Sequence, residues 1–313
     1  MERILRLPIH ELPDRFFADL AYLLCTLPPL DREPGWRFGS AETNPTPAVR
    51  VRLAMWEAAR KRHGGINVEL PWHENTRIRT PLGNDLNRCV FVSGSFEPNE
   101  LTLMRDLLEP GMVVIDAGAN EGLFTLVAAK KVGSEGHVYA FEPSPRERAI
   151  LEANVALNQL TNTTVLPQAL AEMVGEATLT IAENEHAGQN TLGKFIYEVV
   201  KGVGSIQIFT QTIDNLVRTK GLDRVDFIKA DIEGAEAKML RGALRTLRVH
   251  RPMLLLEISD QSLRSQGSSE AALHELLRGN NYQLHEFDPA TGEATKPFSD
   301  SATSRNVFAD ARR

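Results

Sequence analysis

The residues of this chain that could do chemistry gather where short apolar runs end. Val113–Ile115 leads directly into Asp116 and then into a glycine-containing turn over 117–122. In open parallel sheets, ligands bind outside the carboxyl ends of the strands, and this turn would lie at such an end. Gly118 would let the backbone approach a ligand closely, and Gly122 would let the next helix pack tightly. The segment therefore predicts a ligand-binding turn.

A second acidic residue, Glu142, ends the next apolar run, Tyr139–Phe141, and is followed by Pro143. It lies about 20 residues beyond the glycine turn, the distance at which an acidic side chain meets ribose hydroxyls in nucleoside-binding sheets. A carboxylate can accept both hydrogen bonds of a vicinal diol. We therefore expect Glu142 and Pro143 to contact a ribose. The alternative is that the glycines only make a tight turn and that Glu142 is a solvated strand end.

The spacing of glycines argues against a dinucleotide. A G-x-G-x-x-G fingerprint counted from Gly118 would need glycines where Asn120 and Leu123 stand. The second of these glycines is the one that admits a pyrophosphate, and Glu121 adds negative charge beside it. A nucleoside with a cationic sulfonium fits better, because Asp116 and Glu121 would suit its positive charge and its amino group.

A third apolar run, Phe227–Ala230, is followed by Asp231 and Glu233. These two are the best candidates for acid/base or acceptor-binding roles, and Asp231 could alternatively hold an amino group of the cofactor. Glu233 could equally be a charge that stabilises the N-terminus of the following helix. Lys229 is interpreted as a pairing partner or a snorkelling side chain. We find no convincing set of oxygen ligands, so no metal site is predicted.

Two further polar segments have weaker signals. His186 lies in the polar segment 183–190 between two expected strands, and loops over strand ends often set substrate choice. His186 could therefore act as a base, although a loop histidine is more often only solvated. The basic segment Arg60–Arg62 is interpreted as a solvated helix face rather than a site for an acidic acceptor.

The elements that must position these residues alternate between strand and helix. Expected strands cover 112–115, 137–141, 164–166, 225–230, 253–258 and 282–287, with additional strands at 177–181 and 206–209; expected helices cover 123–131, 146–157, 235–247 and 269–278. Alternation on this scale predicts parallel βαβ units and a doubly wound α/β sheet.

The first part of the chain has a different character. We expect helices over 12–24 and 48–62, a Pro- and Gly-rich loop over 28–47, and strands over 66–70, 77–80 and 89–92. The predicted organisation is a helical and β lead-in over 1–83, followed by a Rossmann-like domain over 84–313. The lead-in would cap the acceptor pocket or form a homodimer surface.

Composition limits the partners. The net charge of −6 argues against a surface that neutralises nucleic-acid phosphates. Two cysteines are too few for a disulfide framework or a structural zinc site. The apolar run Leu20–Cys25 is far shorter than the roughly 20 residues of a membrane span, and residues 1–14 do not form a signal peptide. We therefore expect a cytoplasmic protein that binds neither nucleic acid nor membrane.

Taken together, the motifs resemble those of the FkbM-type methyltransferases. The matching segments are VVIDAGANEG at 113–122, YAFEP at 139–143 and DFIKADIEGAE at 226–236. The segment Glu97-Pro98-x-Glu100 also fits. The resemblance implies a class I methyltransferase fold, mostly parallel with an antiparallel last strand, for which 304–309 is the candidate. It also implies S-adenosylmethionine as cofactor and transfer most often to oxygen.

By position, the resemblance assigns the methionine part of the cofactor to the Gly118 turn and the ribose to Glu142. It assigns the adenine to Gln168 and Ala169, and places Asp231 beside the reacting methyl. The chain departs from many relatives at Glu121, Ile232 and Ala171, where an aliphatic residue, Val and Gly are usual. The change at Ala171 leaves the adenine contact less defined.

The leading hypothesis is methyl transfer from S-adenosylmethionine to a hydroxyl of a small molecule or a glycan. One alternative is a nicotinamide-dependent oxidoreductase, against which the missing glycines count. Another is a non-catalytic cofactor-binding or scaffold module with the same fold, since fold alone does not give function.

Overall fold

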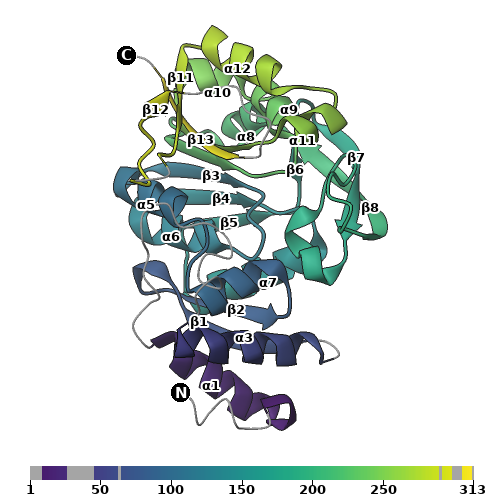
Figure 1. The fold of residues 1–313 in the computed structure, drawn as a ribbon. Helices are drawn as coiled ribbons and strands as arrows, with labels where there is room; N and C mark the ends of the chain where they lie inside the picture. The colour runs from purple at the N-terminus through teal and green to yellow at the C-terminus, as the bar shows by residue number, and fades with distance from the viewer. Residues whose placement is uncertain (1–8, 27–45, 63–64, 289–290, 298–304, 312–313) are drawn as a thin grey trace.

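The central feature of the computed structural model is an eight-stranded sheet in the order β12-β11-β13-β10-β9-β3-β4-β5 (Figure 1). The structure describes residues 9–26, 46–62, 65–288, 291–297 and 305–311. The strands are β3 (Val113–Ala117), β4 (His137–Phe141), β5 (Thr163–Leu166), β9 (Phe227–Ala230), β10 (Met253–Ile258), β11 (Tyr282–Glu286), β12 (Lys296–Pro297) and β13 (Arg305–Ala311).

The strand directions confirm the predicted doubly wound sheet. β3 pairs in parallel with β4 and β9, β4 with β5, and β9 with β10. The last strand, β13, runs antiparallel to both β10 and β11, as predicted. It begins at Arg305, because the first predicted residue, Ser304, lies outside the described residues.

Helices cover both faces because successive strand residues point to opposite sides. Val114 of β3 belongs to a hydrophobic cluster with α5 (Pro98–Leu107) and α6 (Leu123–Val132). Ile115 belongs to the cluster on the other face, with α8 (Ile213–Lys220), α9 (Glu236–Arg241), α10 (Leu244–Val249), α11 (Asp260–Ser265) and α12 (Glu270–Gly279). Both faces of β3 are therefore buried, which explains the unbroken apolar run.

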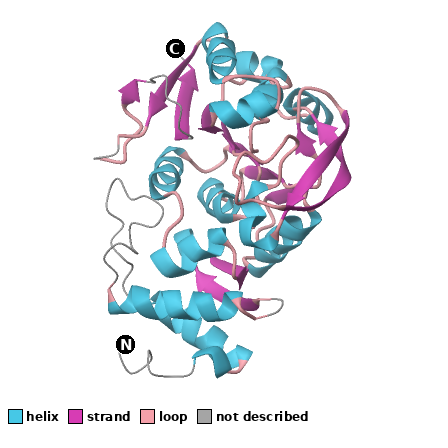
Figure 2. Cartoon of the chain, turned by 45° about the vertical axis from the view of Figure 1, so that its right-hand side comes forward, coloured by secondary structure: helices cyan, strands magenta, loops and turns pink. Residues whose placement is uncertain are grey.

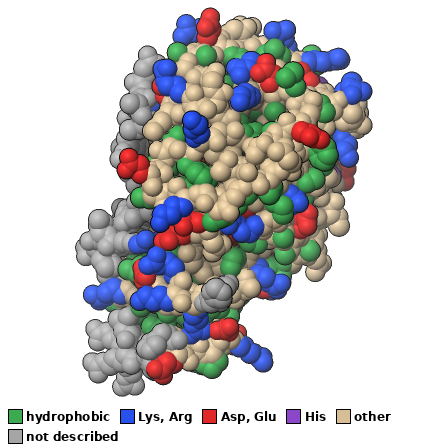
Figure 3. Space-filling view, turned by 90° about the vertical axis from the view of Figure 1, so that its right-hand side faces the viewer, with side chains coloured by type: hydrophobic (Ala, Val, Ile, Leu, Met, Phe, Trp, Pro, Cys, Tyr) green, Lys and Arg blue, Asp and Glu red, His purple; other side chains and the backbone are tan. Residues whose placement is uncertain are grey.

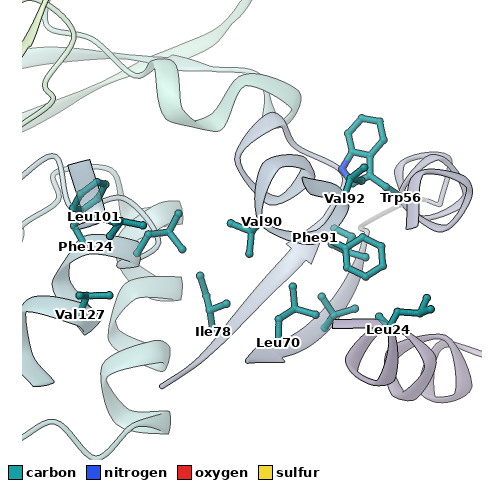
Figure 4. Close-up of a cluster of buried hydrophobic side chains, with 14 of the residues drawn as sticks. Leu24, Trp56, Leu70, Ile78, Val90, Phe91, Val92, Leu101, Phe124 and Val127 are labelled. Atoms are coloured by element: carbon teal, nitrogen blue, oxygen red, sulfur yellow. The ribbon is translucent and has the colours of Figure 1, made fainter. Parts of the chain in front are cut away.

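The lead-in consists of η2 (Ile9–Glu11), α1 (Asp14–Thr26), α3 (Pro47–Arg60) and the hairpin of β1 (Ile66–Pro71) and β2 (Arg77–Leu82), joined by η3 (His73–Asn75). Its helices and strands confirm the elements predicted there. Leu24, Trp56 and Leu70 share one hydrophobic cluster with Phe124 and Val127 of α6 (Figure 4). The core therefore runs across the predicted boundary at residue 84. The predicted loop over 28–47 lies almost wholly outside the described residues.

The strand predicted over 89–92 is wrong. Residues Cys89–Ser93 form a π-helical turn, η4, that continues α4 (Asp85–Arg88). The Asn84 side chain accepts from the backbone N–H of Asn87 at 2.8 Å, and Asn87 accepts from that of Asn84 at 3.2 Å, a capping box that starts the helix. Since the apolar run is buried all round (Figure 4), its hydrophobicity alone could not distinguish strand from helix.

The helix predicted over 235–247 divides at Gly242 into α9 and α10. A Cβ on Gly242 would lie 2.2 Å from the carbonyl oxygen of Ala171, so the chain comes too close here for any side chain. The helix over Pro145–Leu157, α7, agrees with the prediction, with Pro145 in its first turn.

A small second sheet stands beside the first (Figure 2). It contains β6 (Ala169–Leu170), β7 (Gly175–Ala182) and β8 (Gly202–Gln211), and the short helix η5 (Asn184–Gln189) lies between β7 and β8. On the face shown in Figure 3, Lys and Arg side chains are interspersed with Asp and Glu side chains. Among the described residues, no helix has the length and apolar character needed to cross a bilayer.

Candidate active site

The carboxyl ends of three adjacent strands meet around one cavity. In the pairing of β3 with its neighbours, Ala117 lies opposite Phe141 of β4 and Ala230 of β9, so the residues after these three positions are brought together. Six predicted site residues line this cavity: Gly118, Asn120, Glu142, Pro143, Asp231 and Glu233. Leu179 and Leu192, which the sequence did not single out, add apolar lining from the second sheet and the loop that follows η5.

Gly118 is required by the protein itself. It has φ +75°, and a Cβ built on it would lie 1.9 Å from the carbonyl oxygen of Asp231. The close approach that the sequence predicted for a ligand is thus made, in the structure, by the end of β9. Gly122 has the predicted packing role, since a Cβ there would lie 2.8 Å from the Leu151 side chain of α7.

Glu142 is held by the backbone around it. Its Oε2 accepts from the N–H of Asn120 and its Oε1 from the N–H of Ser144, each at 2.9 Å. Burial outweighs these two hydrogen bonds and raises the pKa of Glu142 to about 7. Each carboxylate oxygen keeps a further lone pair, so the side chain can still accept from a diol.

Lys229 is a buried residue of the cavity lining and is paired, as predicted. Its Nζ lies 3.4 Å from both Asp231 Oδ2 and the carbonyl oxygen of Gly118, and 5.1 Å from the centre of the Phe124 ring. Burial alone would lower the pKa of Lys229, but the carboxylates of Asp231, Asp116 and Glu97 outweigh it and raise the pKa. The ammonium therefore stays charged and ties the end of β9 to the glycine turn.

Asp116 and Glu121 are buried beside the cavity without lining it. Asp116 Oδ2 accepts from Thr125 Oγ1 at 2.5 Å, while its Oδ1 has no hydrogen-bond partner. Glu121 Oε1 accepts from Asn84 Nδ2 at 3.1 Å. Burial raises the pKa of both side chains, that of Glu121 to about 7. Glu121 thus connects the turn to α4, which is a different role from the predicted contact with the cofactor.

A second, larger cavity of about 580 Å³ adjoins the first and shares Asn120, Asp231 and Glu233 with it. Here Asp231, Glu233 and Glu257 each offer a carboxylate oxygen, and these oxygens lie within 4.8 Å of one another. Burial, followed by repulsion from Asp231, raises the pKa of Glu233 and of Glu257. The sequence predicted no metal site, yet three carboxylates at this spacing are oxygen ligands of the type that divalent cations use.

Glu97 also lines the second cavity, a position that the sequence did not assign to it. Its Oε1 accepts from Asn306 Nδ2 at 2.9 Å. Burial, followed by repulsion from Glu100 and Asp231, raises the pKa of Glu97 to about 8. The second cavity is therefore rich in carboxyl groups, with Lys229 close to them.

His186 lines the second cavity together with Asp85. Its Nδ1 lies 2.7 Å from Asp85 Oδ2. The sequence singled out His186 but not Asp85, because nothing in the printed sequence connects two residues so far apart. Among the described residues, none before Asp85 lines either cavity. The lead-in instead supports α4, since Trp56 Nε1 donates to Asn87 Oδ1 at 3.1 Å.

Gln168 and Ala169 are not brought to either cavity. Ala169 is buried in β6, which pairs with β8, and Gln168 immediately precedes it. The adenine contact assigned to these residues stays a prediction.

A family model described as the methyltransferase FkbM domain matches residues 116–284. The chain belongs to the FkbM methyltransferase family. Its sheet order and its antiparallel β13 agree with the class I methyltransferase fold that the family implies.

The chain is similar to curated relatives over part of its length. It is 30% identical to methyltransferase sdnD of Sordaria araneosa over 155 residues, which is 41% of this chain and 59% of that protein. It is 25% identical to the 2-O-methyltransferase NoeI of Sinorhizobium fredii over 169 residues, 50% of this chain and 67% of that protein. The matched region thus spans less than two thirds of sdnD.

Solved structures are similar at low identity. A methyltransferase FkbM from Methylobacillus flagellatus KT is 15% identical, with a TM-score of 0.39, covering 70% of this chain and 52% of that one. M. jannaschii TYW2 in complex with AdoMet is 14% identical, with a TM-score of 0.41, covering 80% of this chain and 87% of that one.

Proposed function

We propose that this chain transfers a methyl group from S-adenosylmethionine to a hydroxyl oxygen of a small molecule or a glycan. The observation that supports the proposal most is the meeting of Gly118, Glu142 and Asp231 around one cavity at the carboxyl ends of adjacent strands. Transfer to oxygen is further supported by the similarity to a 2-O-methyltransferase.

The residues present fit the proposed cofactor. Glu142 offers a carboxylate for the ribose diol, and the turn at Gly118 and Asn120 offers backbone for the methionine part. The cavities also hold more carboxyl groups than cations, which suits a positively charged ligand. When bound, S-adenosylmethionine would supply a methyl group already activated by the positive charge on sulfur.

The chain's own task is then to align and to deprotonate. Holding an acceptor hydroxyl in line with the reacting carbon converts an encounter of two molecules into a reaction within one complex. Asp231 and Glu233, shared by both cavities, are placed to bind the acceptor. His186 lines only the second cavity and is the candidate general base.

The first experiment is a thermal-denaturation titration of the full chain with S-adenosylmethionine and, separately, with NADH. A ligand at 100 times its dissociation constant stabilises the folded state by about 2.7 kcal/mol. We expect S-adenosylmethionine alone to raise the melting temperature, and Glu142→Gln to weaken the increase. Stabilisation by NADH would instead favour an oxidoreductase.

A matched control is Glu270→Gln, because Glu270 is also a buried carboxylate but pairs with Arg305 at 2.6 Å and lines neither cavity. It should lower the starting melting temperature and leave the ligand-induced increase intact. A screen of hydroxyl acceptors with radiolabelled S-adenosylmethionine then separates enzyme from binding module: binding without turnover of any acceptor would contradict the proposal.

A further inference from the structure

The side chains of Asp85 and His186 form a hydrogen-bonded pair in the lining of the second cavity, which also includes Asp231 and Glu233. The His186 Nδ1 to Asp85 Oδ2 distance is 2.7 Å. The His186 side chain is 18% exposed and that of Asp85 43%. Both residues line the cavity. Since the proposed reaction removes a proton from an acceptor in this cavity, the function of this pair needs an explanation.

Asp85 is held rigidly by the start of α4. It is the first residue of α4 and directly follows Asn84, whose capping box with Asn87 starts the helix. Trp56 of α3 donates a hydrogen bond to the Asn87 side chain of this cap. The Asn84 side chain also donates to Glu121 of the glycine turn at 3.1 Å. The carboxylate of Asp85 thus stands on a helix start that is fixed on two sides.

His186 is fixed in turn by η5. Its backbone N–H donates to the carbonyl of Glu183 at 3.0 Å. The preceding residue, Glu185, forms an ion pair with Arg60 of α3 at 2.7 Å, and this ion pair lines neither cavity. Gly188 lies close to Asn120, since a Cβ on it would be 3.5 Å from Asn120 Nδ2. The imidazole is therefore attached to a short loop that is anchored at several points.

We propose that Asp85 is a positioning residue for His186, and that His186 is the general base of the methyl transfer. The Asp85 carboxylate accepts the Nδ1 proton of the neutral imidazole, which leaves the lone pair on Nε2. A carboxylate that fixes the tautomer and orientation of a histidine in this way is a recurring arrangement in enzymes. This inference rests on the proposed function.

The proton and electron balance is simple. Nε2 of His186 takes the proton of the acceptor hydroxyl, while an electron pair of that oxygen forms the bond to the methyl carbon. The bond between carbon and sulfur breaks, and its electron pair stays on sulfur, whose positive charge is thereby neutralised. The imidazolium formed at His186 is stabilised by the Asp85 carboxylate.

The other groups of the cavity are less suited to this task. Asp231 is already paired with Lys229 at 3.4 Å. Burial, followed by repulsion from Asp231, raises the pKa of Glu233 and of Glu257, which lowers the fraction of each carboxyl group that is ionised and able to accept a proton. His186 is the base that the surrounding contacts leave available.

The direct test is a nitrogen–proton NMR spectrum of the full chain labelled on its histidines, at a pH where the imidazoles are neutral. His186→Gln identifies the signal of His186 among the eight histidines. We expect the wild-type proton on Nδ1. Asp85→Ala should move it to Nε2, the ordinary preference of a free imidazole, whereas Glu185→Gln, which removes the neighbouring ion pair, should not. A wild-type proton on Nε2, or the same shift in Glu185→Gln, overturns the inference.

Turnover of a hydroxyl acceptor gives a second readout. His186→Gln should lower kcat by about 10²–10⁴-fold, and Asp85→Ala by at least about tenfold. The double variant should be no slower than His186→Gln, because the two residues act as a unit. If the fold-losses of kcat in the two single variants multiply in the double variant, the inference is overturned. Binding of S-adenosylmethionine should be unchanged in every variant; if the wild type does not bind it, the proposed function fails, and the NMR experiment still decides whether Asp85 sets the tautomer.

Discussion

Two sides of the site are built in different ways. The strand wall consists of Gly118, Glu142 and Asp231, which follow the ends of β3, β4 and β9. The loop wall consists of Asp85 and His186, which lie on α4 and η5 and meet across 101 residues of sequence. The first is fixed by backbone contacts within the sheet, and the second by side chains. We therefore expect substitutions in the strand wall to affect folding and cofactor binding together, and those in the loop wall to affect turnover of the acceptor.

The largest expected effect comes from Lys229→Met, which removes the partner of Asp231 in the strand wall. The substitution leaves the Asp231 carboxylate without the ammonium that lies 3.4 Å from it. Breaking a buried ion pair by removing one partner costs about 3–5 kcal/mol, which urea denaturation would measure. Lys130→Met, on the exposed face of α6, should change the free energy of unfolding by no more than about 0.5 kcal/mol. If both variants changed the free energy of unfolding equally, the role of Lys229 as the partner of Asp231 would be contradicted.

Gly118→Ala should lower the free energy of unfolding by nearly as much. The added Cβ would meet the carbonyl oxygen of Asp231 at 1.9 Å, and overpacking costs about 1–3 kcal/mol, besides about 1–2 kcal/mol for a left-handed residue with a side chain. Gly221→Ala is the matched control, since Gly221 is in the left-handed region with φ +63° and has nothing within 4 Å of its Cβ position. It should show only the backbone cost in urea denaturation and keep full affinity for S-adenosylmethionine.

Trp56→Phe tests the support of the loop wall. It removes the indole donor to Asn87, at a cost of about 1–3 kcal/mol. Turnover of the acceptor should fall while the affinity for S-adenosylmethionine stays the same. Trp72→Phe removes a comparable indole hydrogen bond, to the carbonyl of Leu123 at 3.0 Å, and should leave turnover unchanged. If Trp56→Phe instead abolished cofactor binding, the two walls would not be separable.

The smallest effect is a pH dependence of stability, which comes from Glu142 in the strand wall and from Glu236 at the start of α9. Burial raises the pKa of Glu142 to about 7 and that of Glu236 likewise to about 7. Between the ordinary pKa of a glutamate and this value, the folded state binds more protons than the unfolded state, so stability without ligand should decrease as the pH rises through that window.

Binding should show the opposite trend, because a cation favours the ionised carboxylate. From one pH unit below the pKa of Glu142 to one unit above it, the affinity for S-adenosylmethionine should increase by at most about tenfold. Calorimetric titrations over this range would measure it. In Glu142→Gln the increase should be smaller, and an undiminished increase would show that another group is responsible.

The strand wall could be predicted because its residues end buried strands that are visible as apolar runs. Asp116, Glu142 and Asp231 each follow or end such a run, and parallel strands bring their carboxyl ends to one edge. The loop wall could not be predicted in the same way. The π-helical turn over Cys89–Ser93 has the composition of a strand, yet it continues the helix that the capping box at Asn84 begins.

Two further differences come from packing rather than from secondary structure. The sequence predicted a ligand contact for Glu121, but the side chain is bonded to Asn84, which only the fold brings near it. The family resemblance also assigned the adenine to Gln168 and Ala169; neither residue lines either of the two cavities described, and the contact itself stays a prediction. The residue type at a strand end thus indicates that the residue lies at the carboxyl edge of the sheet. It does not indicate which neighbours the side chain contacts.

The glycine at position 118 also limits how this protein can change over generations. Every substitution at a glycine codon that alters the residue adds at least one carbon, and here the space for that carbon is already taken by the backbone of Asp231. The ends of β3 and β9 therefore cannot change in sequence independently of each other. The backbones of Asp85 and His186 have no such steric restriction, since these two residues are joined by a side-chain contact; what restricts the pair is its proposed role in proton transfer. Variation in the proposed acceptor is thus expected to accumulate on the residues of α4 and η5 around this pair, while the proposed site for the methyl donor stays the same.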